Sequence, residues 1–196
     1  KIYKEYQEVC QRDHLVDFGE LLLKSYETIK TSPSVKTFFQ TRFQSILIDE
    51  FQDTNTIQYK WLQEITSDKT NITAVGDDDQ SIYGWRGAKV EHVNSFTEDF
   101  KATEVVRLEQ NYRSTDIILN AANALIDNNK DRLGKNLWTE KKEGEQIVLY
   151  QAYNEQDEAR FVADVLNEWM NGGGAYQETA VLYRSNAQSR AIEEAL

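Results

Sequence analysis

Short apolar runs alternate with stretches of helical periodicity along this sequence, and that alternation limits the fold more than any other feature. The run Ser45-Ile46-Leu47-Ile48 is apolar at consecutive positions, which is typical of a strand buried on both faces of a parallel sheet. Strands that alternate with helices in this way form βαβ units. Nine Gly and one Pro in 196 residues leave few helix breakers. The sequence therefore predicts a helix-rich α/β protein built on a parallel sheet.

The same patterns place the individual elements. Helices are expected at residues 17–30, 57–65, 90–100, 117–126 and 155–170 and at the end of the chain. Strands are expected at residues 45–49, 72–75, 104–108, 147–150 and 179–183, with an irregular connection at 127–144. Asn55 with Gln58, and Ser185 with Gln188, have the spacing of helix capping boxes.

The charge balance limits the possible partners of the chain, and the cysteine count limits its cellular compartment. With 33 acidic and 22 basic side chains the net charge is −11, which argues against nonspecific coating of nucleic acid but does not exclude a local DNA site. Cys10 is the single cysteine, and neither a signal peptide nor an apolar run approaching about 20 residues is present. These features predict a reducing, cytoplasmic setting and no membrane partner.

Two adjacent carboxylates, Asp49 and Glu50, directly follow the first predicted strand. Open α/β sheets bind ligands at the carboxyl ends of their strands. In nucleotide hydrolases an Asp at such a position holds Mg²⁺, and a neighbouring Glu can orient or deprotonate the attacking water. Taken alone, the pair fits equally well with two solvated acids that begin a turn.

A glycine-containing loop, Gly76 to Ala88, follows the next predicted strand. Tyr83, Trp85 and Arg86 offer two stacking faces and a cation, which suits the bases of a single strand. The alternative is an aromatic mini-core under a surface loop, which the glycines on either side of Trp85 disfavour. The run 77–79 of three Asp lacks calcium-loop spacing and is interpreted as a solvated turn.

A third polar segment, Leu108 to Ser114, again joins a predicted strand to a helix. Within it, Tyr112 can stack on a base and Arg113 can bind phosphate, although this signal is weak alone. The sequence contains no P-loop, since the nearest approach, at Gly134-Lys135, has Asn129 in place of the first Gly.

At these three segments the sequence resembles the UvrD/PcrA/Rep family of superfamily one DNA helicases. Asp49 to Asn55 resembles motif II, Gly76 to Ala88 motif III, and Leu108 to Ser114 motif IV; the likeness extends over essentially the whole chain. The resemblance implies incomplete parts of two RecA-like, P-loop NTPase-type domains. Residues 1–13 would end an inserted helical subdomain, 14–108 would be the latter part of the first motor domain, and 109–196 the first part of the second.

The resemblance also implies a role for each matching residue. Asp49 would hold Mg²⁺, Glu50 would activate the hydrolytic water, and Gln80 would sense the γ-phosphate of ATP. Tyr112 would stack on adenine, and Arg113 would approach the γ-phosphate from the second domain. DNA contacts are implied at Tyr83, Trp85, Arg86, Arg184 and Asn186.

By the same resemblance the chain is expected to be an internal fragment of a 3′-to-5′ helicase. That helicase would act on single-stranded DNA and duplex junctions in DNA repair, with repair accessory proteins as partners. Because the P-loop is missing from these residues, the fragment alone is expected to hydrolyse ATP negligibly.

Two other functions stay open on the sequence alone. A DNA-binding or partner-docking module with a degenerate motor fold would show no turnover, but such a relic has no need of Asp49, Glu50, Gln80 and Arg113 together. A metal-dependent nuclease would instead cleave DNA with metal alone and without ATP.

Overall fold

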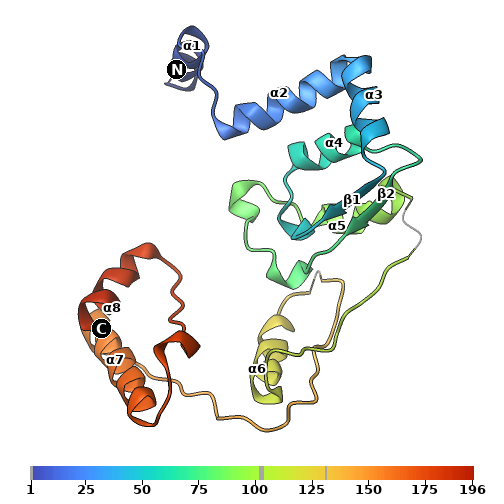
Figure 1. Cartoon of the computed structure of the whole chain (residues 1–196). Coiled ribbons are helices and arrows are strands. Elements are labelled where there is room, and N and C mark those ends of the chain that lie inside the picture. Colours follow the sequence, from blue (N-terminus) through green and yellow to red (C-terminus); the bar gives the residue numbers. More distant parts are fainter. Residues whose placement is uncertain (1, 102–103, 131) are drawn as a thin grey trace. The chain divides into compact units, whose positions relative to one another are not determined.

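The computed structural model describes residues 2–101, 104–130 and 132–196. The chain divides into two compact units, residues 1–143 and residues 144–196. The first unit contains α1 (Ile2–Arg12), α2 (Phe18–Thr31), α3 (Pro33–Arg42), β1 (Ser45–Ile48), α4 (Thr56–Ile65), β2 (Asn71–Ala74), α5 (Glu91–Asp99) and α6 (Asp116–Ile126). The second contains α7 (Glu155–Asn171) and α8 (Ser189–Ala195) (Figure 1). The chain is therefore α/β and rich in helix, as predicted.

The predicted helices are all present, and their caps explain where they begin. The Asp17 side chain accepts a hydrogen bond from the Glu20 backbone N–H at the start of α2. Asn55 and Gln58 form the predicted capping box at the start of α4. The periodicity did not predict α3, which begins at Pro33, where the missing N–H of proline costs no helical hydrogen bond.

β1 and β2 form a two-stranded parallel sheet over the described residues, and α4 connects them in a βαβ unit. Successive side chains of a strand point to opposite faces. Ile46 and Ile48 pack against the core, whereas Leu47 lies on the other face and is 80% exposed. The prediction that β1 is buried on both faces is therefore wrong, because no described element covers the face that carries Leu47.

The core lies on the covered face of this sheet. Its buried side chains come from α2, from the turn after β1 and from α4: Ile29, Phe51, Tyr59, Leu62 and Ile65. Each such burial removes apolar surface from water and stabilises the fold by about 1.5–3 kcal/mol. Since Phe51 directly follows Glu50, this core also fixes the chain at the carboxyl end of β1.

Three of the predicted strands are not formed. Residues 104–108, 147–150 and 179–183 belong to no sheet among the described residues, and Val106 and Leu149 within these runs are exposed. Close by, Gln110 and Trp138 form a single parallel bridge. An apolar, β-branched run favours extended backbone, but a strand also needs a hydrogen-bonded neighbour.

The second unit is an α7–α8 pair whose helix ends follow the sequence signals. The Asn154 side chain caps α7, and the helix ends at the glycines 172–174, where Gly173 has a φ of +92°. Ser185 and Gln188 form the predicted capping box on a 3₁₀ turn just before α8. In neither unit is a described helix both long and apolar enough to cross a membrane.

Candidate functional site

The predicted carboxylates, Asp49 and Glu50, lie at the carboxyl end of β1 and are both exposed. The Asp49 Oδ1 accepts a hydrogen bond of 2.9 Å from the Glu50 backbone N–H. Glu50 has a φ of +50°, a left-handed conformation that costs a residue with a side chain about 1–3 kcal/mol. The chain therefore makes a strained turn directly after the strand, at the edge of the sheet where α/β proteins bind ligands.

Gln52 joins this turn to the loop after β2. Its side chain is 1% exposed. Its Nε2 donates to Glu50 Oε2 at 2.6 Å, and its Oε1 accepts from the Asp77 backbone N–H at 2.9 Å. No sequence pattern predicts a role for Gln52, and its place within the strand-end motif is the only signal that marks it.

Gly76 allows the two loops to approach each other this closely. A Cβ atom at this position would lie 2.8 Å from Gln52 Oε1 and 3.2 Å from the Phe51 backbone nitrogen. The same backbone nitrogen donates to the Val75 carbonyl at 3.0 Å. A side chain at residue 76 would therefore separate the ends of β1 and β2.

Gln80 lies in the loop after β2 and is exposed, with its side chain held by Asp77. The Gln80 Nε2 donates to Asp77 Oδ2 at 2.7 Å. Within the described residues no hydrogen bond joins Gln80 directly to Asp49 or Glu50. A hydrogen-bonded path instead runs from Glu50 through Gln52 and Asp77 to Gln80.

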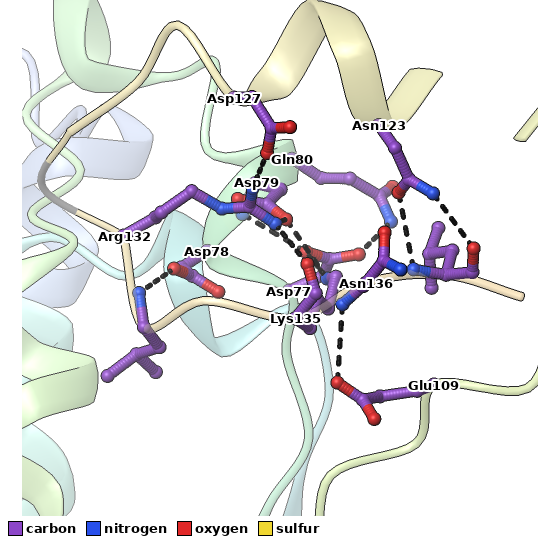
Figure 2. Close-up of polar contacts among 12 residues, drawn as sticks. Asp77, Asp78, Asp79, Gln80, Glu109, Asn123, Asp127, Arg132, Lys135 and Asn136 are labelled. Atoms are coloured by element: carbon purple, nitrogen blue, oxygen red, sulfur yellow. Dashed lines mark hydrogen bonds and ion pairs between the residues drawn. The ribbon is translucent and has the colours of Figure 1, made fainter. Parts of the chain in front are cut away.

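The three acids 77–79 are not the solvated turn that the sequence indicated. Their side chains are half-buried, and residues 132–135 contact them (Figure 2). Burial raises the pKa of the Asp77 carboxyl, but the hydrogen bonds from Lys135 and Gln80 outweigh it, so this pKa lies below its usual value. The three carboxylates lie within 4.8 Å of one another, but Lys135 and Arg132 already supply the positive charge they need.

Asp49 has the chemistry that a magnesium ligand needs. Mg²⁺ prefers carboxylate oxygens and keeps several waters, so an exposed acid suits it better than a closed cage. One Asp49 oxygen holds the turn, and the other makes no hydrogen bond to any described residue. The residues present therefore fit a magnesium ion at Asp49, with Glu50 beside it.

Trp85 and Arg86 of the second motif lie on a 3₁₀ turn, Gly84–Arg86, farther along the same loop, and the half-buried Tyr83 directly precedes this turn. Trp85 is 74% exposed, so it is not part of a mini-core. The Arg86 guanidinium lies 5.0 Å from the Tyr83 ring centroid and 4.8 Å from that of Trp85. A hydrogen bond from the Lys89 backbone N–H to the Thr54 carbonyl ties the end of this loop to the start of α4.

Tyr112 and Arg113 precede α6 and are both exposed. The Asn111 Oδ1 accepts hydrogen bonds from the backbone N–H groups of Arg113 and Ser114, which fixes this turn. The Arg113 guanidinium contacts no acid among the described residues, and Tyr112 donates only to Gln110. The structure thus does not bring these two side chains to Asp49.

Arg184 and Asn186 lie in the second unit, next to the capping turn before α8, and both are exposed. No hydrogen bond of either side chain to a described residue is formed. Their side chains are therefore accessible to a ligand.

The comparisons with known proteins identify the class. Residues 1–101 match the UvrD/REP helicase N-terminal domain, and residues 106–196 match the UvrD-like helicase C-terminal domain. The chain therefore belongs to the UvrD/REP helicase family.

Individual relatives cover the whole chain. It is 58% identical over 196 residues to DNA helicase II of Haemophilus influenzae and 57% identical to DNA helicase II of Escherichia coli, spanning 27% of each relative. It is 45% identical over 193 residues to ATP-dependent DNA helicase PcrA of Staphylococcus aureus, spanning 26% of that protein. The chain thus spans about a quarter of the length of these relatives.

Proposed function

We propose that these residues form part of an ATP-driven helicase that moves 3′ to 5′ along single-stranded DNA and unwinds duplex DNA, with a role in DNA repair in the cytoplasm. The observation that carries this proposal is the shared loop after β2. Gln80 at its start is linked to Glu50 through Gln52 and Asp77, and Trp85 farther along is exposed. A conformational change that begins at a bound phosphate can therefore be transmitted to a DNA contact along this single loop.

The proposed division of labour follows the chemistry of each side chain. Asp49 holds Mg²⁺, which neutralises phosphate charge when bound, and Glu50 takes a proton from the attacking water. Gln80 senses the γ-phosphate, Arg113 approaches it, and Tyr112 stacks on adenine. Residues 14–108 and 109–196 are proposed as parts of two motor domains, with residues 1–13 ending an inserted subdomain.

The DNA contacts are proposed on two segments. The exposed Trp85 ring, the half-buried Tyr83 ring and the Arg86 cation are offered to the bases and backbone of a single strand. Arg86 packs over both rings, so a base that stacks on Trp85 would displace it. Arg184 and Asn186 are proposed to face the same strand.

Unwinding polarity tests the proposed function. The full-length helicase, incubated with ATP and Mg²⁺, should separate a duplex with a 3′ single-stranded tail and leave a duplex with a 5′ tail paired. Strand separation by gel electrophoresis measures both. If both duplexes are bound but neither is unwound, the chain belongs to a non-catalytic docking module; cleavage with metal alone would identify a nuclease.

Replacing Trp85 by Ala should weaken single-stranded DNA binding by about 5- to 150-fold, because stacking on one aromatic ring contributes roughly 1–3 kcal/mol. DNA-stimulated ATPase should fall in parallel, while ATPase without DNA should change little. Fluorescence anisotropy with a labelled oligonucleotide measures the affinity. Tyr153→Ala, which removes a 96% exposed aromatic ring elsewhere, is the matched control. Unchanged affinity in Trp85→Ala would rule out the stacking role.

A further inference from the structure

The acidic run 77–79 is held by a segment more than fifty residues further along the chain. Arg132 binds Asp79 at 2.9 Å, Lys135 binds Asp77, and the Leu133 backbone N–H donates to Asp78 Oδ2 at 2.8 Å. All three acids are therefore engaged by residues 132–135, as Figure 2 shows.

These contacts join the two halves that the family comparison distinguishes. The acids lie within residues 1–101, which match the helicase N-terminal domain, and Arg132 and Lys135 lie within residues 106–196, which match the C-terminal domain. The basic segment is itself anchored to its own half. Asn123 of α6 exchanges two hydrogen bonds with the backbone of Leu137, and Glu109 accepts one from the Asn136 N–H.

Asp77 is the point at which this contact meets the candidate site. One oxygen of its carboxylate accepts from Lys135 and the other accepts from Gln80. The Lys135 and Asp77 side chains are 17% and 25% exposed, so solvent screens their attraction only in part. Fixing the carboxylate from one side therefore fixes the amide of Gln80 on the other.

The network is not arranged for maximal stability. Asp79 Oδ1 and Arg132 Nε are buried, and neither has a hydrogen-bond partner among the described residues. A two-fold Arg–carboxylate contact would satisfy both atoms. The single hydrogen bond between Arg132 and Asp79 is therefore weaker than a two-fold contact would be. A weaker contact is suited to being broken and formed again.

We propose that Lys135 is a positioning residue for Gln80: by holding Asp77, it sets the orientation of the phosphate-sensing amide according to whether residues 132–135 are docked. The inference rests on the proposed role of Gln80. It makes the contact between the two helicase halves a part of phosphate sensing, in addition to any role of Arg113.

Steady-state ATPase of the full-length helicase with single-stranded DNA tests this. Lys135→Met should lower kcat by about 2- to 30-fold, the range found for residues that couple two sites, and leave the KM for ATP unchanged. Lys135→Arg, which keeps a cation, should restore most of kcat. Lys101→Met is the matched control, because Lys101 pairs with Asp68 where both side chains are over four-fifths exposed; its kcat should equal that of the unchanged protein.

A double-mutant cycle separates this role from a structural one. In a Gln80→Ala background, Lys135→Met should lower kcat no further, because the amide that it positions is gone. If Lys135→Met destabilises the protein, Lys135→Gln is measured instead: it removes the cation that holds Asp77 but keeps a polar side chain, so it should also lower kcat, and a kcat equal to that of the unchanged protein would overturn the inference. An undiminished effect of Lys135→Met in the Gln80→Ala background would also overturn it. If Gln80→Ala alone leaves kcat unchanged, the proposed phosphate-sensing role of Gln80 is wrong, and the inference about Lys135 falls with it.

Discussion

Replacing Glu50 by Gln should lower the DNA-stimulated kcat of the full-length helicase by about 10²- to 10⁴-fold, the usual contribution of a general base. The KM for ATP and the affinity for single-stranded DNA should change little, because neither depends on removing a proton from water. A coupled assay of ADP release measures kcat and KM, and fluorescence anisotropy measures DNA affinity.

The surroundings of Glu50 allow this substitution to remove the carboxylate while keeping the local structure. Its Oε2 accepts from the buried Gln52 amide at 2.6 Å, and the carbonyl oxygen of a glutamine side chain can accept the same bond. The turn, with its positive φ at residue 50, should therefore persist. Thermal unfolding of the variant, equal to that of the unchanged protein, checks this.

Glu27→Gln is the matched control, because Glu27 is exposed on α2 and outside the candidate site. Its kcat should not change. The 196-residue chain alone should show no ATP turnover that depends on Glu50, since its sequence lacks a P-loop to cradle the phosphates. A loss below tenfold in the full-length variant, or turnover by the chain alone that Glu50→Gln abolishes, would contradict the assignment.

The helices could be predicted from sequence because their signals are local. The caps at Asp17, Asn55 and Ser185 involve partners two or three residues away. The strands were predicted less well, because a strand depends on a partner that the run itself does not specify. β1 and β2 pair with each other, whereas residues 104–108 and 147–150 are also rich in β-branched and apolar residues but have no neighbouring strand in the described chain.

The residues of the candidate site also differ in whether their signals are local or depend on distant contacts. Asp49 and Glu50 lie directly after β1, and Trp85 lies in the loop after β2, so position and residue type made them candidates, whereas Gln80 became one only through the resemblance to the helicase family. Lys135 was noticed only as part of a failed P-loop match, because its contact with Asp77 spans 58 residues. Contacts of that separation depend on how elements pack, and no local pattern encodes them.

Replacing Phe51 by Ala should lower the free energy of unfolding of the first unit by about 3–5 kcal/mol. Phe51 is 3% exposed, and its ring packs edge-on against Phe96 at 5.1 Å and tilted against Tyr59 at 6.1 Å between centroids. An alanine there would leave a cavity between the turn after β1, α4 and α5. Urea denaturation of the 196-residue chain followed by circular dichroism measures the loss.

Phe18→Ala is the matched control, since Phe18 is 91% exposed at the start of α2; the free energy of unfolding of this variant should differ from that of the unchanged protein by no more than about 0.5 kcal/mol.

The burial of Phe51 also affects the candidate site. Phe51 lies between Glu50 and Gln52, so its burial holds the turn that presents the carboxylate and the amide that links it to the loop after β2. In the full-length helicase Phe51→Ala should therefore lower kcat at temperatures where the protein is still folded. Equal losses of stability in the two variants would mean that Phe51 is not the anchor of this turn.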